Sequence, residues 1–194
     1  VLVGFEQGGT AYRLPLLARL APELAFSDMN ALILGYNDKV KATLARLAAN
    51  ADTLQGAAVA VDEVQLLAPI VRPLQDVVCL GINYKAHAQE AGRFSDEAFG
   101  GERPYTIYFS KRVNRATATG EKVPAYAGLV DSLDYEAELG VVLGRDAKGV
   151  TKEEARDYVF GYTIINDISA RNLQTRHKQW YLGKSLDGFT PMGP

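Results

Sequence analysis

Cysteine, histidine and net charge are scarce in this sequence, and each scarcity excludes a class of protein. Cys79 is the only cysteine, so no disulfide can form within one chain, which fits a reducing compartment. The formal net charge is −2 and there is no basic run, which argues against nucleic acid as a partner. No apolar stretch approaches the length of a membrane span, and no signal peptide is visible, so we expect no membrane partner.

The composition is that of a globular protein, with 47% hydrophobic and 23% charged residues in a chain of 194. That length suffices for a small domain and a larger one. We predict a small N-terminal domain of structural role at residues 1–72, in which Asn37 or Asp38 caps a helix over 38–49. Residues 73–194 are rich in predicted strands and form the second domain. The turn-like end at 190–194 lacks a closing element, so we expect this domain to be incomplete at its C-terminus.

Two carboxylates stand two residues apart in the predicted strand 132–143. Because side chains alternate along a strand, Glu136 and Glu138 share one face and the apolar residues from Tyr135 to Leu143 share the other. The Cα atoms of the two glutamates then lie about 6.6–7 Å apart. Such a pair repels unless a cation or strong donors compensate. A metal site is one interpretation, and an edge strand with a wet outer face is an equally weighted alternative.

Asp167 is a further candidate carboxylate, on a strand predicted to follow a short helix. Thr151 and Glu154 form a capping box for that helix. The strand predicted over 160–168 then places Gly161, Thr163, Ile165 and Asp167 on one face. Asp167 therefore lies near the end of that strand, where functional side chains commonly emerge.

His87 and Glu90 form a His-x-x-Glu pattern. Residues three apart share a face of a helical turn, so the carboxylate can orient the imidazole and raise its basicity, as a general base requires. From the residues alone, a surface histidine beside an unrelated glutamate is the favoured interpretation. The other histidine, His177, lies between Arg176 and Lys178 and is expected to be a solvated loop residue.

Four motifs in order resemble the fumarylacetoacetate hydrolase family. They are the His-x-x-Glu segment 83–90, Glu136-x-Glu138, the segment 166–174 (Asn-Asp-Ile-Ser-Ala-Arg-Asn-Leu-Gln) and the segment 183–187 (Gly-Lys-Ser-Leu-Asp). The resemblance covers roughly residues 76–194. It implies an α+β fold in which a strand-dominated, mixed sheet is wrapped into a roll, with the metal at its open mouth. Lys111 and Arg112 stand where many family members have a lysine-proline pair.

The resemblance also implies roles for individual residues. It makes Glu136, Glu138 and Asp167 the ligands of one divalent cation per chain. An all-oxygen set of this kind suits Mg²⁺ or Mn²⁺ and disfavours structural zinc. The resemblance further implies a catalytic pair and a group of substrate contacts: His87 and Glu90; Lys184, Gln174 and Arg171. For Arg171 a structural role, pairing with the ligand carboxylates, has equal weight. Asp131 and Asp134 are expected to be turn residues.

The family resemblance implies a metal-dependent enzyme acting on a small 2-oxo acid, soluble, cytoplasmic and homodimeric. The leading expectation is hydrolysis of an acylpyruvate- or fumarylpyruvate-type 2,4-dioxo acid, in which a carbon–carbon bond breaks and an enolate is released. Decarboxylation or tautomerisation of oxaloacetate, and isomerisation of an unsaturated 2-oxo diacid (a 2-hydroxyhepta-2,4-diene-1,7-dioate isomerase-type reaction), need the same enolate and are the alternatives. A silent, non-enzymatic binding module is a further alternative, against which the intact His-x-x-Glu pair argues.

Overall fold

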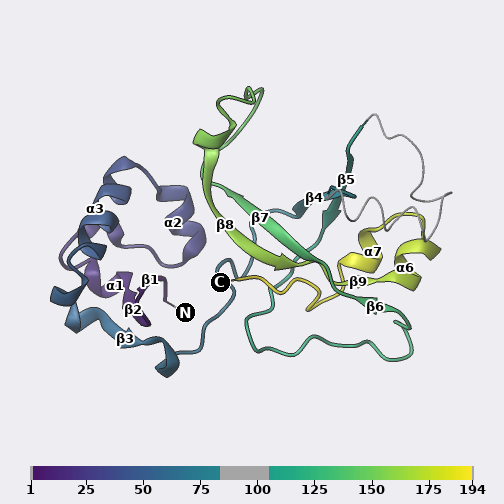
Figure 1. Ribbon diagram of the computed structural model, residues 1–194, viewed down its shortest axis with the longest axis horizontal. Helices are drawn as coiled ribbons and strands as arrows, with labels where there is room; N and C mark the ends of the chain where they lie inside the picture. The colour runs from purple at the N-terminus through teal and green to yellow at the C-terminus, as the bar shows by residue number, and fades with distance from the viewer. Residues whose placement is uncertain (1, 84–104, 194) are drawn as a thin grey trace.

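The computed structural model describes residues 2–83 and 105–193, and its elements fall into two groups along the longest axis (Figure 1). The described strands are β1 Gly4–Gln7, β2 Thr10–Arg13, β3 Ala58–Ala60, β4 Val77–Gly81, β5 Ile107–Lys111, β6 Leu133–Asp134, β7 Ala137–Leu143, β8 Val159–Asn166 and β9 Ser169–Ala170. The described α-helices are α1 Leu14–Leu17, α2 Met29–Gly35, α3 Asp38–Ala48, α6 Arg171–Arg176 and α7 Tyr181–Lys184. Short 3₁₀ turns supply the remaining helical segments.

The N-terminal group packs its helices beside a three-stranded antiparallel sheet in the order β1-β2-β3. Asn37 caps α3 as predicted, because its side chain accepts a hydrogen bond from the amide of Val40. Asp28 caps α2 in the same way. The buried residues of this group form one apolar core, drawn from positions 3–57.

One contact joins this core to the strands that follow. The ring of Tyr36, after α2, meets Phe160 at the start of β8 edge to face, with ring centroids 4.9 Å apart. Phe160 packs against the N-terminal core. The division into domains at residue 72 stays a prediction.

The remaining described strands pair as β4-β5, β6-β9 and β7-β8, all antiparallel. The single wrapped, mixed sheet that the resemblance implies is therefore replaced, in the part of the chain the structure describes, by several small sheets. The predicted strand 132–143 is also divided, at Tyr135 and Glu136, into β6 and β7. At this break the backbone amides donate to side chains instead of to a neighbouring strand. The amide of Tyr135 donates to the Asp134 carboxylate at 2.9 Å, and the amide of Glu136 donates to the Asn166 side chain at 3.1 Å.

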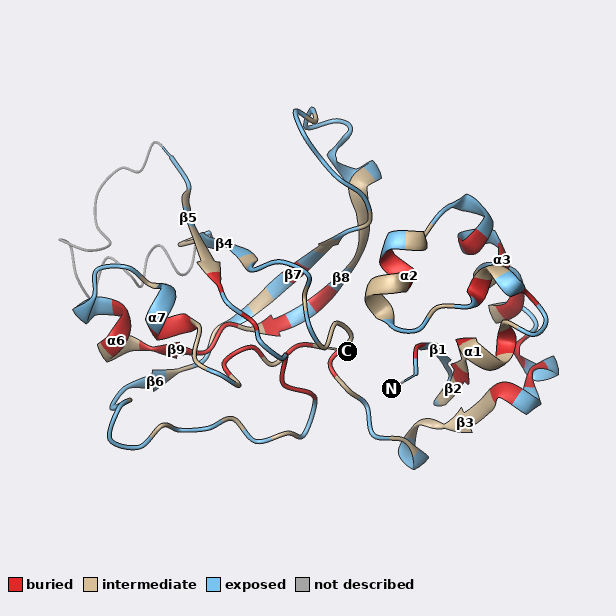
Figure 2. Ribbon diagram, turned by 180° about the vertical axis from the view of Figure 1, so that it is seen from behind, coloured by how far each residue is buried: buried red, intermediate tan, exposed pale blue. Residues whose placement is uncertain are grey.

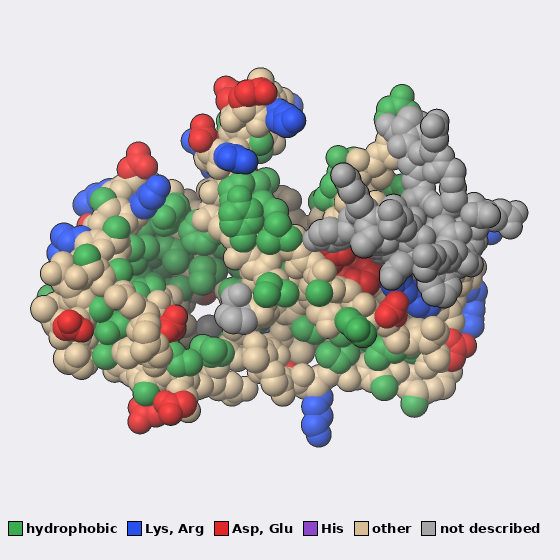
Figure 3. All heavy atoms as spheres, in the orientation of Figure 1, with side chains coloured by type: hydrophobic (Ala, Val, Ile, Leu, Met, Phe, Trp, Pro, Cys, Tyr) green, Lys and Arg blue, Asp and Glu red, His purple; other side chains and the backbone are tan. Residues whose placement is uncertain are grey.

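The predicted alternation along β7 is confirmed, and its apolar face is the exposed one. Glu138 and Gly140 face inward, opposite Ile165 and Thr163 of β8. The outward face carries apolar side chains that are at least half exposed: Leu139, Val141, Leu143, Tyr162 and Ile164. Figure 2 shows the exposed residues along this hairpin, and Figure 3 shows hydrophobic side chains gathered over it.

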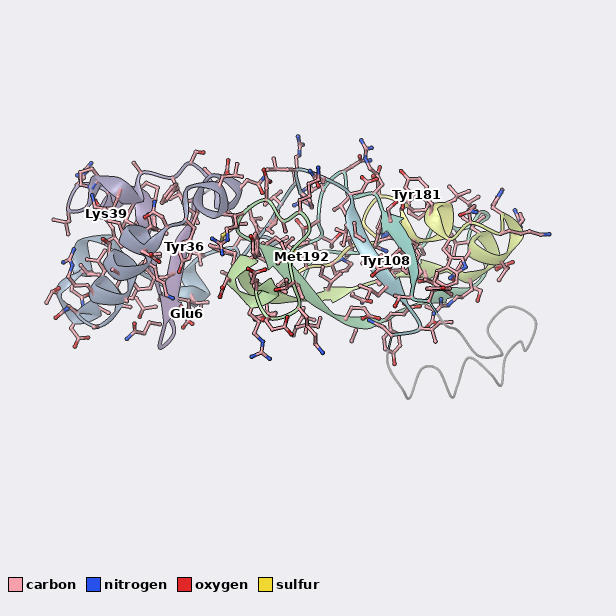
Figure 4. All side chains as sticks on the ribbon, turned by 90° about the horizontal axis from the view of Figure 1, so that it is seen from above. Glu6, Tyr36, Lys39, Tyr108, Tyr181 and Met192 are labelled. Atoms are coloured by element: carbon pink, nitrogen blue, oxygen red, sulfur yellow. The ribbon has the colours of Figure 1, made fainter. Side chains whose placement is uncertain are left out.

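The segment 190–193 is not a free turn, contrary to the expectation from the sequence. Met192 donates to the carbonyl of Thr117 at 3.0 Å, and Gly193 donates to that of Ile164 at 2.9 Å. The segment thus lies between Thr117 and β8, and Met192 joins a small buried cluster near the middle of the molecule (Figure 4). This pairing holds the end of β8, and hence Asp167, against the rest of the structure.

Other predictions were met in part. The capping box is confirmed, since Thr151 and Glu154 exchange hydrogen bonds, but the helix that follows is a 3₁₀ turn, Ala155–Tyr158. Helices α6 and α7 were not predicted. Among the described residues no helix is both long and apolar enough to cross a membrane.

Changing Asn37 to Ala removes the cap of α3. We expect a loss of about 1 kcal/mol in the free energy of unfolding, since an uncapped amide at the helix start is left to water. Urea unfolding followed by circular dichroism measures the loss. Asn37→Asp keeps an acceptor and should stay close to the parent; equal loss in both variants would contradict a capping role.

Candidate active site

Glu136 and Asp167 face each other where the β7–β8 ladder ends. The register pairs Ala137 with Asn166, and the amide of Asp167 donates to the carbonyl of Glu136 at 2.8 Å. Directly opposed residues have Cβ atoms about 4.5–5.5 Å apart. Both side chains are shielded, that of Asp167 with 6% of its surface exposed and that of Glu136 with 14%. Two carboxylates this close in a shielded place need positive charge.

The ammonium group of Lys184 lies between the two carboxylates. Its Nζ is 2.7 Å from Oδ2 of Asp167 and 3.0 Å from Oε2 of Glu136, and it also donates to Oγ of Ser169 at 2.8 Å. Lys184 is 2% exposed. A single buried cation therefore bridges the pair, which shows that the pocket is built around positive charge.

Helix α7 can bring Lys184 this close because Gly183 has no side chain. A Cβ at position 183 would lie 2.6 Å from the amide nitrogen of Gln174 and 2.8 Å from the carbonyl oxygen of Ala170. Both are backbone atoms, so neither can move aside easily. The glycine thus allows α7 to press against α6 and β9.

Lys111, the last residue of β5, binds the other oxygen of Asp167. Its Nζ donates to Oδ1 at 2.6 Å and to the carbonyl of Ile168 at 3.0 Å, and none of its surface is exposed. Burial lowers the pKa of Lys111, which Asp167 partly offsets. Burial alone would raise the pKa of Asp167, but the charges of Lys111 and Lys184 outweigh it and lower that pKa.

Arg171, the first residue of α6, joins three acceptors. Its Nε and Nη2 donate to Oδ2 of Asp134 at 3.0 and 2.7 Å, and Nη2 also donates to Glu136. Its Nη1 donates to the side-chain oxygen of Gln174 at 2.9 Å. Burial opposes the charge on Arg171, yet Glu136 and the hydrogen bonds raise its pKa. The structural role weighed for Arg171 is thus present, and Asp134, predicted to be only a turn residue, anchors it.

Aromatic side chains close one side of the cluster. The Nζ of Lys184 lies 5.1 Å from the ring centre of Phe109, and Phe109 meets Trp180 edge to face with centroids 5.2 Å apart. A Cβ at Gly81 would come within 2.6 Å of the Trp180 ring, so a glycine is what lets β4 pass there. These rings exclude water from one side of the charges, which strengthens the electrostatic interactions among them.

The structure brings together five of the residues expected at the site: Glu136, Asp167, Arg171, Gln174 and Lys184. Glu138 lies on the same inward face of β7, and with Asp167 it contributes to raising the pKa of Cys79. His87 and Glu90 lie outside the described residues. Sequence reasoning did not assign Lys111 or Ser169 to the site. For Lys111 the available signal was its place at the lysine of the family's lysine-proline pair, in which Arg112 stands instead of the proline.

The donor set fits a hard divalent cation in chemistry, although the carboxylates are not yet gathered around one point. Within residues 2–83 and 105–193, no group of three or more His, Cys, Asp or Glu side chains is arranged to hold a metal ion. Glu136 and Asp167 are nevertheless joined through one cation, the ammonium of Lys184. Carboxylate oxygens are the ligands that Mg²⁺ and Mn²⁺ favour, so the types of donor present fit such an ion.

Comparison with known proteins decides the family. Residues 76–194 match the model of the fumarylacetoacetate (FAA) hydrolase C-terminal domain. The chain belongs to the fumarylacetoacetate hydrolase family. It is 47% identical over 132 residues to oxaloacetate tautomerase YisK of Bacillus subtilis (strain 168), an alignment that spans 68% of this chain and 42% of YisK. The chain thus spans less than half the length of the curated relatives it matches.

Solved structures of the family have the same fold. The fumarylacetoacetate hydrolase from psychrophilic Exiguobacterium antarcticum superimposes with a TM-score of 0.72 at 32% identity, over all of this chain and 61% of that one. Maleylpyruvate hydrolase from Sphingobium sp. SYK-6, in complex with manganese(II) and pyruvate, gives a TM-score of 0.68 at 22% identity, over all of this chain and 62% of that one. The proteins to which the chain is similar thus include a tautomerase and two hydrolases.

Cys79 on β4 should be nearly inert to alkylation while the protein is folded. Burial, aided by the charge of Asp167, raises its pKa to about 12, and the thiolate is the reactive form. At pH 8 we expect iodoacetamide to react at least ~100-fold more slowly with the folded protein than with the urea-unfolded protein. Because this is the only cysteine, mass spectrometry reads it directly. Equal rates would show that the thiol is not held in this environment.

Proposed function

We propose that this chain carries the charge-stabilising half of a divalent-metal-dependent active site that converts a small 2-oxo acid through an enolate. The observation that supports this most is the Lys184 ammonium bridging Glu136 and Asp167. A buried cation held by two carboxylates and walled by aromatic rings is suited to an oxyanion that develops during reaction. Burying such a charge cluster costs desolvation free energy, and a silent binding module would have no need for it.

Tautomerisation of oxaloacetate is the reaction we put first. It is favoured by the 47% identity to oxaloacetate tautomerase YisK. The family model matches residues 76–194, which hold Glu136, Asp167 and Lys184. Hydrolysis of an acylpyruvate-type 2,4-dioxo acid is the second candidate, supported by the fold shared with a maleylpyruvate hydrolase. Both reactions pass through an enolate of a 2-oxo acid, that of oxaloacetate in the first and that of pyruvate in the second, and they differ in what the general base deprotonates.

Glu136 and Asp167 would hold the cation, with Glu138 as the proposed third ligand. When bound, Mg²⁺ or Mn²⁺ supplies positive charge that polarises the 2-oxo group. Lys184 keeps a proton at Nζ beside both carboxylates and would donate it as a hydrogen bond to the developing oxyanion.

Arg171 and Gln174 hold each other in place on α6. That fixed arrangement leaves the guanidinium at the edge of the site, where about a third of its side chain is exposed. The exposed part is available to a substrate carboxylate, while Asp134 keeps the group oriented. Arg171 would therefore combine the structural role with substrate binding.

His87, oriented by Glu90, is the proposed base. In tautomerisation it would take the proton from C3 of the keto form, and the imidazolium so formed would return a proton to the oxygen at C2, which gives the enol and restores the neutral base. In hydrolysis it would instead deprotonate the water that attacks the 4-oxo carbon. Only the second reaction breaks a carbon–carbon bond.

Lys184→Met tests the charge-stabilising role. We expect turnover of oxaloacetate or acetylpyruvate with Mg²⁺ to fall by about 10²–10³ in kcat, the usual cost of removing one oxyanion donor. Chelation by EDTA should abolish the parent's activity. Lys148→Met, in an exposed loop between β7 and β8, is the matched control and should retain parental rates. Metal-independent turnover, or none of either substrate in the parent, would refute the proposed function.

Tautomerisation and hydrolysis both need the proposed base, so His87→Ala separates these two reactions from metal-driven decarboxylation. Hydrolysis of acetylpyruvate should collapse, because no group then activates the water. Decarboxylation of oxaloacetate, driven by the cation, should persist in part. Stopped-flow absorbance follows both substrates with the same protein. Equal rates in variant and parent for all substrates would remove His87 from the mechanism.

A further inference from the structure

Asp167 uses both of its oxygens, and each one has its own lysine. Oδ2 accepts from Lys184, which also contacts Glu136, while Oδ1 accepts from Lys111. The two lysines approach from different elements, α7 and the end of β5. Each lysine therefore constrains a different oxygen of the Asp167 carboxylate.

Lys184 occupies the space between the two carboxylates, so an ion bound there would have to displace it. Among the described residues, Lys111 forms its ion pair with Asp167 and makes no hydrogen bond or ion pair with Glu136. It reaches Asp167 from outside the pair, and its second bond, 3.0 Å to the carbonyl of Ile168, ties the ammonium to the backbone one residue further on. Its contacts are thus compatible with an ion on the Oδ2 side.

Burial makes the position of Lys111 well defined. The whole residue is inaccessible to solvent, and a lysine without any water contact must keep its hydrogen bonds or lose several kcal/mol. The bond to Ile168 fixes the ammonium, and the ammonium in turn fixes Oδ1. Rotation of the Asp167 carboxylate would break the 2.6 Å contact.

We infer that Lys111 is a positioning residue: it anchors Oδ1 of Asp167 so that Oδ2 faces Glu136, in the metal-free protein as well as in the loaded one. The inference rests on the proposed function only in that Oδ2 is then the oxygen offered to the cation. A partner that orients a metal-binding side chain typically contributes 10–100-fold to metal affinity. Lys111 also repels a nearby cation, and the inference requires orientation to outweigh that repulsion.

The test uses Lys111→Met, which keeps much of the length and removes the charge and both hydrogen bonds. A crystal structure of the metal-free variant should show the Asp167 carboxylate turned away from Glu136. An unchanged carboxylate would overturn the inference whether or not the protein binds any metal.

Mn²⁺ binding to the full chain, followed by the loss of the free-ion electron paramagnetic resonance signal, gives the second readout. We expect the Kd of Lys111→Met to rise about 10–100-fold, at a temperature where circular dichroism shows both proteins folded. Lys148→Met is the control and should bind as the parent does. An unchanged Kd would indicate a purely structural lysine, and a lower one would show that repulsion dominates; either result overturns the inference.

Two further outcomes are distinguishable. If the parent itself binds no Mn²⁺, the proposed function fails while the crystal structure still decides the role of Lys111. If Lys111→Met does not fold, Lys111→Gln takes its place, because a neutral amide is cheaper to bury and too short to keep both bonds. The same rotation of Asp167 and the same loss of Mn²⁺ affinity are expected of it.

Discussion

A shared buried cation holds the described site together. Removing one partner from a buried ion pair leaves an uncompensated charge and typically costs about 3–5 kcal/mol. Lys184 balances both Glu136 and Asp167, so the ends of β7 and β8 and helix α7 must stay in register with one another. Gly183, the turn of backbone at Glu136 and the segment 190–193 all serve that register.

The charges of the cluster are balanced before any metal is added. Three carboxylates face three cations: Asp134, Glu136 and Asp167; Lys111, Arg171 and Lys184. A dication entering between Glu136 and Asp167 would therefore compete with Lys184 for the same oxygens. If the proposed ion binds there, this competition would free the ammonium to donate to a substrate oxyanion, and metal binding would then be coupled to the charge-stabilising role of Lys184.

Local patterns in the sequence predicted the local features well. The alternation along β7, the Asn37 cap and the Thr151–Glu154 capping box depend on neighbours within a few residues, and all three are present. The family motifs also led to Asp167 and Lys184, which the structure brings into contact. The resemblance was needed for that step, because nothing local indicates which distant carboxylates a lysine will meet.

Non-local features were beyond such reasoning. The break between β6 and β7 depends on the side chain of Asn166, thirty residues away in sequence. The role of Lys111 depends on its hydrogen bond to Asp167, fifty-six residues further along the chain. Helices α6 and α7 are only six and four residues long, and neither has a side-chain cap, so they lack both the periodicity and the start signals on which a prediction depends.

Anomalous diffraction from crystals soaked in Mn²⁺ tests the central claim most directly, since it locates the ion without reference to turnover. The account predicts a single strong peak within bonding distance of Glu136 and Asp167, with the Lys184 ammonium moved from between them. A peak elsewhere, or none while Lys184 still bridges the two carboxylates at saturating Mn²⁺, would contradict it.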